Sequence, residues 1–159
     1  MCYAGFKVEI RPATTEDLPA VYELIKELAI YEEAPDEPTN PLDTFIADGS
    51  GQHPKFRVLI AQFGTEIIGI ALYYLGYSTW KGSMMYLDDF VVKESWRRKG
   101  IGKQLLEQLI NKAKEHEVNQ LRWHVLNWNQ PAIAFYQQIG ASLDPTWITC
   151  KLEKDRLYL

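Results

Sequence analysis

Cysteine is scarce in this chain of 159 residues, which has one thiol at Cys2 and another at Cys150. Two cysteines do not make the repeated spacing of a disulfide framework, and we therefore expect a reducing, cytoplasmic setting. The three histidines, His53, His116 and His124, are scattered without an HExxH or CxxC pattern. Because a metal site needs several ligands at a suitable spacing, we expect no metal.

Long apolar runs and a surplus of positive charge are also missing. No stretch approaches the length of a membrane span, the first ten residues lack the basic-then-apolar order of a signal peptide, and the formal net charge is -4. We therefore expect neither a membrane nor a nucleic acid as partner. With 47% hydrophobic and 13% aromatic residues, the composition is that of a globular protein. The length favours a single domain over residues 1–159.

Hydrophobic periodicity predicts an α/β fold with a mixed sheet and helices on both faces. We expect a helix after Thr14, because Thr14 is a good N-cap and Asp17 follows three residues later, as in a capping box. A turn at Gly64-Thr65 predicts antiparallel strands, whereas the strand–helix–strand unit around Gly100 predicts parallel ones. Strands are expected at residues 6–12, 56–63, 66–74, 84–93, 121–126 and 147–153, helices at residues 14–30, 40–49, 100–116 and 129–138, and a loop at residues 76–82.

Residues 97–102 read RRKGIG and connect a predicted strand to a predicted helix. The first amide N–H groups of a helix have no partner inside it, and together with the helix dipole they favour an anion. Glycine lets a ligand approach the backbone closely. A phosphate or pyrophosphate suits this site, although an ordinary turn with solvated cations is the simpler alternative for Gly-x-Gly alone.

Two common nucleotide motifs do not fit these residues. A Walker loop requires GxxxxGK[ST], but Gln104 follows Gly102-Lys103. A dinucleotide fingerprint requires G-x-G-x-x-G, but Leu105 stands where the third glycine belongs. The anion therefore has to belong to another class of ligand.

The pattern Arg97-x-x-Gly100-x-Gly102 resembles the R/Q-x-x-G-x-G/A signature of the GCN5-related N-acetyltransferase (GNAT) superfamily. Residues 129–136, NQPAIAFY, are similar to its N-x-x-A-x-x-F-Y segment, and the two segments keep the family order. IRPATTEDL, LIKELAIYEE and MMYLDDFVVKESWRRKGIG further resemble the diamine (spermidine/spermine-type) acetyltransferases. The resemblance covers nearly the whole chain and implies a mostly antiparallel, twisted sheet with a central parallel β-α-β unit and splayed central strands.

The resemblance implies that acetyl-CoA is the cosubstrate. Backbone N–H groups from Arg98 to Lys103 are then expected to bind the pyrophosphate, and backbone groups of Phe90 and Val92 to pair with the pantetheine arm as an added strand. That pairing needs an open sheet edge, which we expect after Phe90. The full expected cofactor set is Phe90, Val91, Val92, Arg97, Arg98, Lys99, Gly100, Ile101, Gly102, Lys103, Asn129, Pro131, Ala132 and Tyr136.

Acetyl transfer to an amine also needs a proton acceptor and a proton donor. The family assigns the tyrosine of the F-Y pair, here Tyr136, as the acid that protonates the leaving thiolate. Without the resemblance, Tyr136 reads as a helix residue packed in a core. Asp88 and Asp89 are adjacent in an apolar strand, so we expect their side chains on opposite faces. Asp88, where the diamine enzymes have the longer glutamate, is expected to accept the amine's proton through water, whereas Asp89 is expected to cap nearby backbone.

Acceptor recognition is expected from Tyr31, Glu32, Asp88 and Trp80. Tyr31-Glu32 match a Tyr-Glu pair of the diamine enzymes, and negative charge attracts a cationic substrate. Trp80 and Trp147 either wall the acceptor pocket through cation–π contact or belong to the core. Ser78-Thr79 stand where polyamine enzymes carry an acidic residue before the loop tryptophan, which disfavours long polyamines.

The leading hypothesis is an acetyl-CoA-dependent N-acetyltransferase that acts on the primary amine of a diamine, polyamine or lysine-like amino acid. The resemblance to the diamine enzymes also implies a homodimer. Two alternatives stay open. One is an acetyltransferase acting on proteins or peptides, and the other is a non-catalytic acetyl-CoA-binding regulatory module, which would need neither Tyr136 nor Asp88.

Overall fold

The computed structural model describes residues 7–157, and these divide after His124 into two compact units. The first unit contains five strands and three α-helices: β1 (Glu9–Pro12), α1 (Leu18–Tyr31), α2 (Leu42–Asp48), β2 (Arg57–Phe63), β3 (Glu66–Ser78), β4 (Gly82–Val92), α3 (Ile101–Glu115) and β5 (Gln120–Arg122). Short 3-10 turns, Thr15–Asp17 and Glu94–Trp96, precede α1 and follow β4. The second unit contains α4 (Gln130–Gln138) and α5 (Lys154–Leu157).

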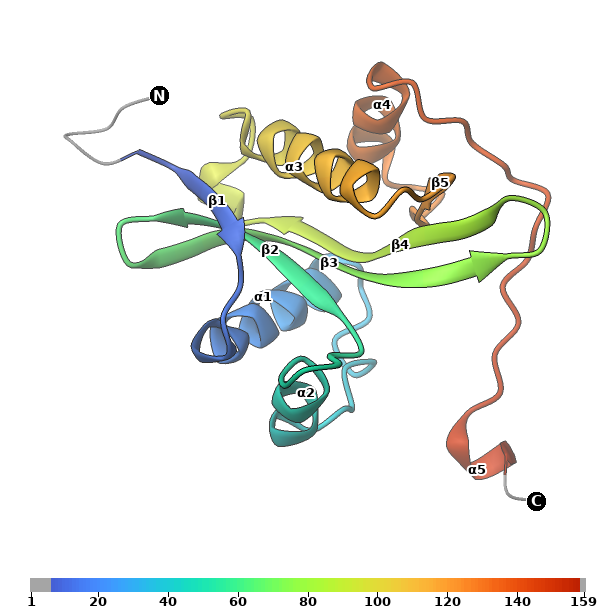
Figure 1. The fold of residues 1–159 in the computed structure, drawn as a ribbon, viewed down its shortest axis with the longest axis horizontal. Coiled ribbons are helices and arrows are strands. Elements are labelled where there is room, and N and C mark those ends of the chain that lie inside the picture. Colours follow the sequence, from blue (N-terminus) through green and yellow to red (C-terminus); the bar gives the residue numbers. More distant parts are fainter. Residues whose placement is uncertain (1–6, 158–159) are drawn as a thin grey trace. The chain divides into compact units, whose positions relative to one another are not determined.

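The sheet of the first unit has the strand order β1-β2-β3-β4-β5. The first four strands are antiparallel to their neighbours, and β5 lies parallel to β4. The expected parallel unit around Gly100 is thereby confirmed, because α3 is the crossover helix between β4 and β5. In Figure 1, α1 and α2 cover one face of the sheet and α3 covers the other.

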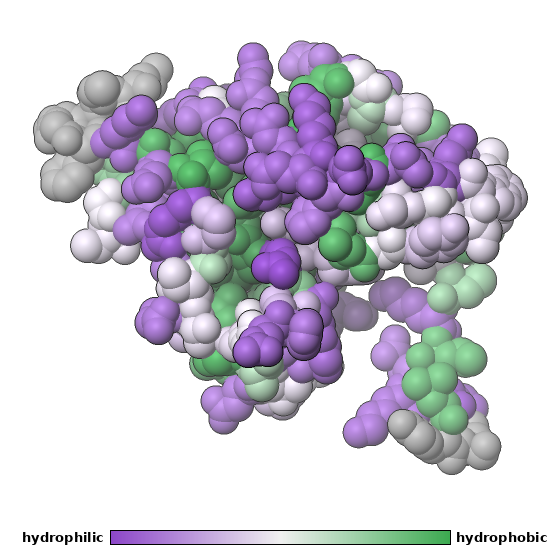
Figure 2. Space-filling view, viewed as in Figure 1, coloured by the Kyte–Doolittle hydropathy of each residue, from purple (hydrophilic) through white to green (hydrophobic). Residues whose placement is uncertain are grey.

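Each face of the sheet has its own apolar layer. On the α1 face, Val21 and Leu24 of the helix pack with strand residues that include Ile60, Ile70 and Leu72. On the opposite face, α3 turns a buried stripe to the sheet, formed by Ile101, Leu105, Leu106, Leu109 and Ala113. Burial of each such leucine or isoleucine stabilises the fold by about 1.5–3 kcal/mol. The outward surface of α3 is hydrophilic, as Figure 2 shows.

The start of α1 is held by the capping interaction that the sequence predicts. The Asp17 carboxylate accepts a hydrogen bond from the Thr14 backbone N–H at 2.7 Å. Arg11 on β1 donates to the same carboxylate at 2.7 and 3.0 Å. The first strand and the first helix are therefore fixed to each other by one acidic residue.

Three expected elements differ from the observed ones. β3 continues to Ser78 and β4 begins at Gly82, so most of the predicted 76–82 loop is a long hairpin. Pairing continues because Gly76 and Tyr77 find partners in Met84 and Ser83, which local glycine content does not reveal. β5 is short, and residues 147–153 form no strand.

The predicted strand at residues 147–153 is wrong for a physical reason. Its apolar residues give the segment a local preference for extended structure, but a strand also needs a neighbouring strand with which to pair. Trp147, Ile148 and Leu152 are instead 73%, 88% and 70% exposed. The predicted start of the first strand at Phe6 lies outside the described residues.

Candidate functional site

A β-bulge interrupts the middle of β4. Across the β3–β4 pair, Leu72 lies opposite Asp89 and Tyr73 lies opposite Leu87, so that Asp88 is one residue in excess. Leu72 belongs to the apolar layer on the α1 face, which places Asp89 on that face as well. A bulge of this kind bends the strand and redirects side chains.

Both aspartates of the bulge lie on the α1 face. Desolvation raises the pKa of Tyr74 and that of Tyr86, and the negative charge of Asp88 is the second largest cause in both cases. The two tyrosine rings stack at 5.2 Å, and Tyr74 shares the face of Leu72 because it lies two residues further along β3. The expectation that Asp88 and Asp89 point to opposite faces is therefore wrong, because the bulge breaks the alternation.

Three carboxylates gather on this face. Desolvation, followed by the charges of Asp88 and Glu32, raises the pKa of Asp89 to about 7. Desolvation also raises the pKa of Glu32, which directly follows α1, and that of Asp88, although Asp88 still reaches solvent. We call Glu32, Asp88 and Asp89 the acidic cluster. A bound cation would stabilise all three carboxylates in their ionised form.

Beyond the bulge β4 does not pair with β5, and we call this stretch of β4 the open edge. β5 pairs with β4 only from Met84 to Tyr86, so the remaining stretch to Val92 has no β5 residue beside it. The Lys93 N–H donates to the Ile68 carbonyl of β3 at 2.9 Å. Because backbone groups alternate between the two edges of a strand, those of Phe90 and Val92 are directed to the open edge. The expected splay is present, and it begins before Phe90 instead of after it.

The loop between β4 and α3 has a strained, compact backbone. Arg98 and Gly100 have φ angles of 58° and 80°. Gly100 suits its position because glycine adopts positive φ at little cost. The Gln104 N–H donates to the Gly100 carbonyl at 3.1 Å, which is the first hydrogen bond of α3. The N–H groups of residues 101–103 therefore have no acceptor within the helix. These amides and the helix dipole favour an anion at the start of α3.

The protein atoms around Gly102 leave room for a side chain. A Cβ built there would lie 3.8 Å from the Phe90 ring and 3.9 Å from Val92, which are ordinary contact distances. A side chain is thus compatible with the neighbouring protein atoms. The absence of a side chain instead leaves the backbone accessible to a ligand at the start of α3.

The cations of the loop have different neighbours. Arg97 donates its Nε–H to the Val92 carbonyl at 3.0 Å, and its guanidinium lies 4.7 Å from the centre of the Tyr31 ring. The Lys99 ammonium lies 4.8 Å from the centre of the Trp96 ring, and Lys103 approaches Glu107 at 3.9 Å. Arg97 therefore joins the end of β4 to the end of α1.

In the second unit, α4 begins with a capped turn. The Asn129 side chain accepts a hydrogen bond from the Ala132 N–H at 3.3 Å, and Pro131 occupies the first turn, which suits proline. Tyr136 is 6% exposed, and its ring centre lies 5.4 Å from that of Phe135. The segment that resembles N-x-x-A-x-x-F-Y is thus a helix with a defined start and one buried tyrosine.

Comparison with known proteins identifies the family. The model of the Acetyltransferase (GNAT) family matches residues 18–141. The chain belongs to the GNAT acetyltransferase family. It is similar to the thialysine N-epsilon-acetyltransferase of Bos taurus, at 37% identity over 84% of each chain. It is 33% identical to the human spermidine/spermine N(1)-acetyltransferase-like protein 1, over 94% of this chain and 23% of that longer protein.

Solved structures give the same assignment for the fold. An integron cassette protein of V. cholerae superimposes with a TM-score of 0.77, at 27% identity and over 94% of each chain. The GNAT-type mixed sheet expected from the sequence is confirmed. The chain is therefore an acetyl-CoA-dependent N-acetyltransferase, because GNAT enzymes are acyltransferases that use acetyl-CoA.

Two tryptophans lie away from the core of this GNAT fold. Trp80 is 81% exposed at the tip of the β3–β4 hairpin. From Gly82 to Asp88 the strand advances roughly 20 Å, so the structure does not bring Trp80 to the acidic cluster. Trp147, in the second unit, is 73% exposed. The alternative that they are core residues is wrong.

Sequence reasoning missed Tyr74, Tyr86 and His124. Tyr86 shares a hydrogen bond with the Nδ1 atom of His124, and Tyr74 stacks on Tyr86 beside Asp88. The two-residue spacing of Tyr86 and Asp88 was a usable signal, because such residues share one face of a strand. The contribution of His124 depends on the β4–β5 register, which the sequence does not specify.

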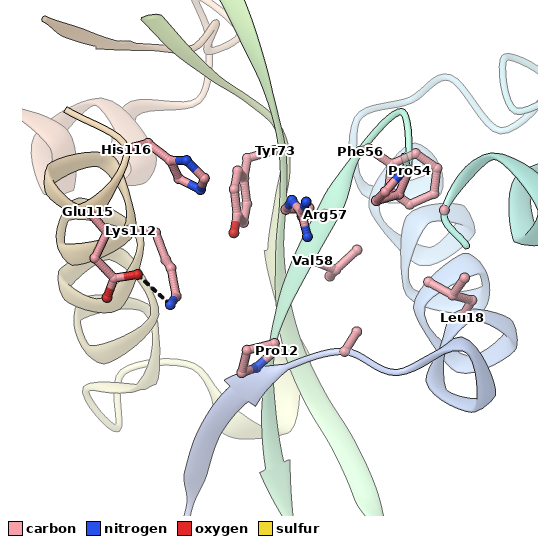
Figure 3. A pocket seen from close by; sticks show the side chains of 12 residues that line it. Pro12, Leu18, Pro54, Phe56, Arg57, Val58, Tyr73, Lys112, Glu115 and His116 are labelled. Carbon is pink, nitrogen blue, oxygen red and sulfur yellow. Dashed lines mark hydrogen bonds and ion pairs between the residues drawn. The ribbon is translucent and has the colours of Figure 1, made fainter. Parts of the chain in front are cut away.

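A separate cavity of about 340 Å³ lies at the other end of α3 (Figure 3). Lys112, Glu115 and His116 of α3 line it together with Arg57 and Tyr73, and Lys112 forms an ion pair with Glu115 at 2.7 Å. The residues that line this cavity do not include the start of α3 or the acidic cluster.

Within residues 7–157, no group of three His, Cys, Asp or Glu residues is arranged to hold a metal ion. No helix in that part of the chain has the length and apolar character needed to cross a membrane.

Proposed function

We propose that this N-acetyltransferase acetylates the primary amine of a small cationic substrate, namely a diamine, a polyamine or a lysine-like amino acid. The observation that carries the proposal is the acidic cluster beside the bulge of β4. Desolvation and then the charges of Asp88 and Glu32 raise the pKa of Asp89 to about 7. An alkylammonium group would relieve that repulsion, whereas a neutral or anionic acceptor would not.

The names of two relatives support this substrate class. Thialysine and spermidine, which appear in those names, both carry primary amines on flexible chains. Spermidine is the longer, and the residues before Trp80 lack the acidic side chain that favours long polyamines. A short diamine or an amino acid with an amine-bearing side chain is therefore the preferred acceptor.

Acetyl-CoA, when bound, supplies the thioester whose acetyl group is transferred. The backbone amides from Arg98 to Lys103 hold its pyrophosphate, with the charges of Arg97, Arg98 and Lys99 nearby. The backbone groups of Phe90 and Val92, on either side of Val91, pair with the pantetheine amides along the open edge. The family resemblance adds Asn129, Pro131 and Ala132 of α4 to the proposed set of cofactor residues. That the two compact units work as one acetyltransferase domain is part of the proposal, and it is supported by a family match that extends from the first unit to residue 141 of the second.

The chemistry needs a neutral amine, since an alkyl ammonium ordinarily titrates near 10. Tyr31, Glu32 and Asp88 bind the ammonium, and Asp88, acting through water, assists its deprotonation. The amine nitrogen then forms a bond to the thioester carbonyl carbon as the bond from carbon to sulfur breaks. Tyr136 donates its proton to the departing thiolate, and the second proton, which the nitrogen loses as the amide forms, passes through water to restore the phenol. A homodimer is part of the proposal, with light scattering as its test.

The test is an acetyl-CoA assay on a panel of diamines, polyamines, lysine analogues and peptides, with N-acetylated amines as controls. We expect the highest kcat/KM for short diamines or lysine analogues. The variants Glu32→Gln and Asp88→Asn should each raise KM for the amine at least about tenfold, since each removes a partner of the cation. Preference for peptides, with the small amines left unmodified, would contradict the proposal.

A further inference from the structure

The Tyr86 hydroxyl and the His124 imidazole form a hydrogen-bonded pair next to the acidic cluster. The Tyr86 oxygen contacts the Nδ1 atom of His124, and the two ring centres are 5.7 Å apart. Arg122 lies opposite Tyr86 in the β4–β5 pair, and His124 follows two residues later. Because side chains two residues apart in extended chain share a face, the imidazole lies on the α1 face with Tyr86 and Asp88.

The surroundings of Tyr86 keep its hydroxyl protonated. Desolvation, then the charges of Asp88 and Tyr74, raise the pKa of Tyr86, while Arg122 acts in the opposite direction. In the tautomer of His124 that carries its proton on Nε2, this hydroxyl donates to Nδ1. The interaction between Asp88 and His124 lowers the pKa of Asp88 and so opposes the desolvation that raises it. His124 thus interacts with Tyr86 through a hydrogen bond and with Asp88 through charge, and Tyr74 and Arg122 act in turn on Tyr86.

Building on the proposed function, we propose that His124 is the proton acceptor for the substrate amine and that the proton reaches it through the Tyr86 hydroxyl. The ammonium gives one proton to the Tyr86 oxygen while the original Tyr86 proton moves to Nδ1 of His124. The products of this step are a neutral amine, a neutral tyrosine and an imidazolium beside Asp88. His124 is exposed and returns its proton to water.

Asp88 and the Tyr86–His124 pair, which lie on the same face of the sheet, have different roles in this proposal. Asp88, as a carboxylate, holds the ammonium and stabilises the imidazolium. Imidazole is the side chain that ordinarily titrates closest to neutral pH, and an acceptor matched to the working pH transfers protons most effectively. His124 acts through Tyr86 and does not contact the amine, whereas Tyr86 does.

The experiment compares wild type with His124→Ala, His124→Gln and Tyr86→Phe, with His116→Ala as a matched control in an exposed histidine at the end of α3. We expect kcat to fall by about 10²-fold or more in the first three, with acetyl-CoA affinity within about twofold of wild type. Added imidazole should restore the acetylated amine product in His124→Ala, because the site is open to solvent. It should not restore activity in Tyr86→Phe, and His116→Ala should behave as wild type.

The split between kcat and KM gives a second readout. In the His124 variants kcat should fall while KM for the amine stays near the wild-type value, because Glu32 and Asp88 still bind the ammonium. Wild-type kcat in the His124 variants, or a loss of activity that imidazole does not restore, would overturn the relay alone. A wild-type enzyme that acetylates no amine would overturn the proposed function and the relay together.

Discussion

Arg97 donates its Nε–H to the backbone carbonyl of Val92 across 3.0 Å, and its guanidinium lies over the ring of Tyr31. This one side chain connects the end of β4, the loop before α3 and the end of α1. Its position explains how the proposed cofactor site and the proposed acceptor site remain in register, because the two sites adjoin the same residue from different elements.

Removal of this connection should affect both sites. Arg97→Ala loses one hydrogen bond and one cation–π contact, which together are worth about 1–2 kcal/mol of unfolding free energy. We expect a lower melting temperature, weaker acetyl-CoA binding and a higher KM for the amine. The control is Lys114→Ala, since Lys114 is an exposed cation in the last turn of α3. An Arg97→Ala enzyme with unchanged affinities would limit Arg97 to a role in stability.

Asp89→Asn should change the pH dependence of stability. Folded Asp89 keeps its proton up to about pH 7, whereas the unfolded chain releases it near the ordinary value of 3.8. This residue therefore lowers the unfolding free energy as the pH rises from about 4 to about 7. The asparagine variant lacks that loss, so it should melt at a higher temperature than wild type at pH 8 and lose this advantage at pH 4.5.

Calorimetry of both proteins across this range measures the effect, with the exposed loop variant Asp36→Asn as control. A wild-type enzyme whose advantage over Asp89→Asn grows toward pH 8 would show that Asp89 is stabilised as an anion.

The ionisation of Asp89 should also affect the binding of a cationic amine, which should improve as the pH rises. Protonation of Asp89 below about pH 7 removes negative charge, so KM for a cationic amine should rise as the pH falls.

Tyr136→Phe separates the chemical role of the hydroxyl from the packing of the ring. Tyr136 is 6% exposed, and phenylalanine keeps its shape. Turnover should fall by about 10²-fold or more if the phenol is the acid, while acetyl-CoA affinity should change by less than about twofold. Tyr77→Phe, at a residue that is 76% exposed on β3, serves as the matched control. Normal turnover in Tyr136→Phe would leave its ring with a packing role only.

Local signals predicted much of this fold correctly. The capping interaction of Thr14 and Asp17, the glycines around α3 and the start of α4 at Asn129 depend on neighbouring residues, so short stretches of sequence contain the necessary information. The 147–153 segment shows the limit of such signals. Its apolar composition favours an extended chain, but the presence of a neighbouring strand depends on the rest of the fold.

The candidate site was predicted less completely, because part of it depends on pairing between strands. The bulge at Asp88 arises from the register of β3 against β4, and it moves Asp89 to the face opposite the one that simple alternation predicts. His124 enters the site through the register of β5 against β4. Neither register can be read from a single strand, so the Tyr86–His124 pair was not predicted.

The central claim is that the amides at the start of α3 bind the pyrophosphate of acetyl-CoA, and Gly102 tests it most directly. In Gly102→Ala the new Cβ meets only ordinary contacts, the nearest at 3.8 Å, and alanine favours a helix over glycine by about 1 kcal/mol. Calorimetric titration of acetyl-CoA into wild type, Gly102→Ala and Gly102→Val is therefore the decisive measurement. We predict that both variants fold, with a melting temperature equal to or above wild type for alanine. Gly102→Ala should bind acetyl-CoA with nearly wild-type affinity, because the family signature accepts alanine at this position, whereas the larger side chain of Gly102→Val should weaken binding at least about tenfold. Wild-type affinity in folded Gly102→Val would contradict the claim.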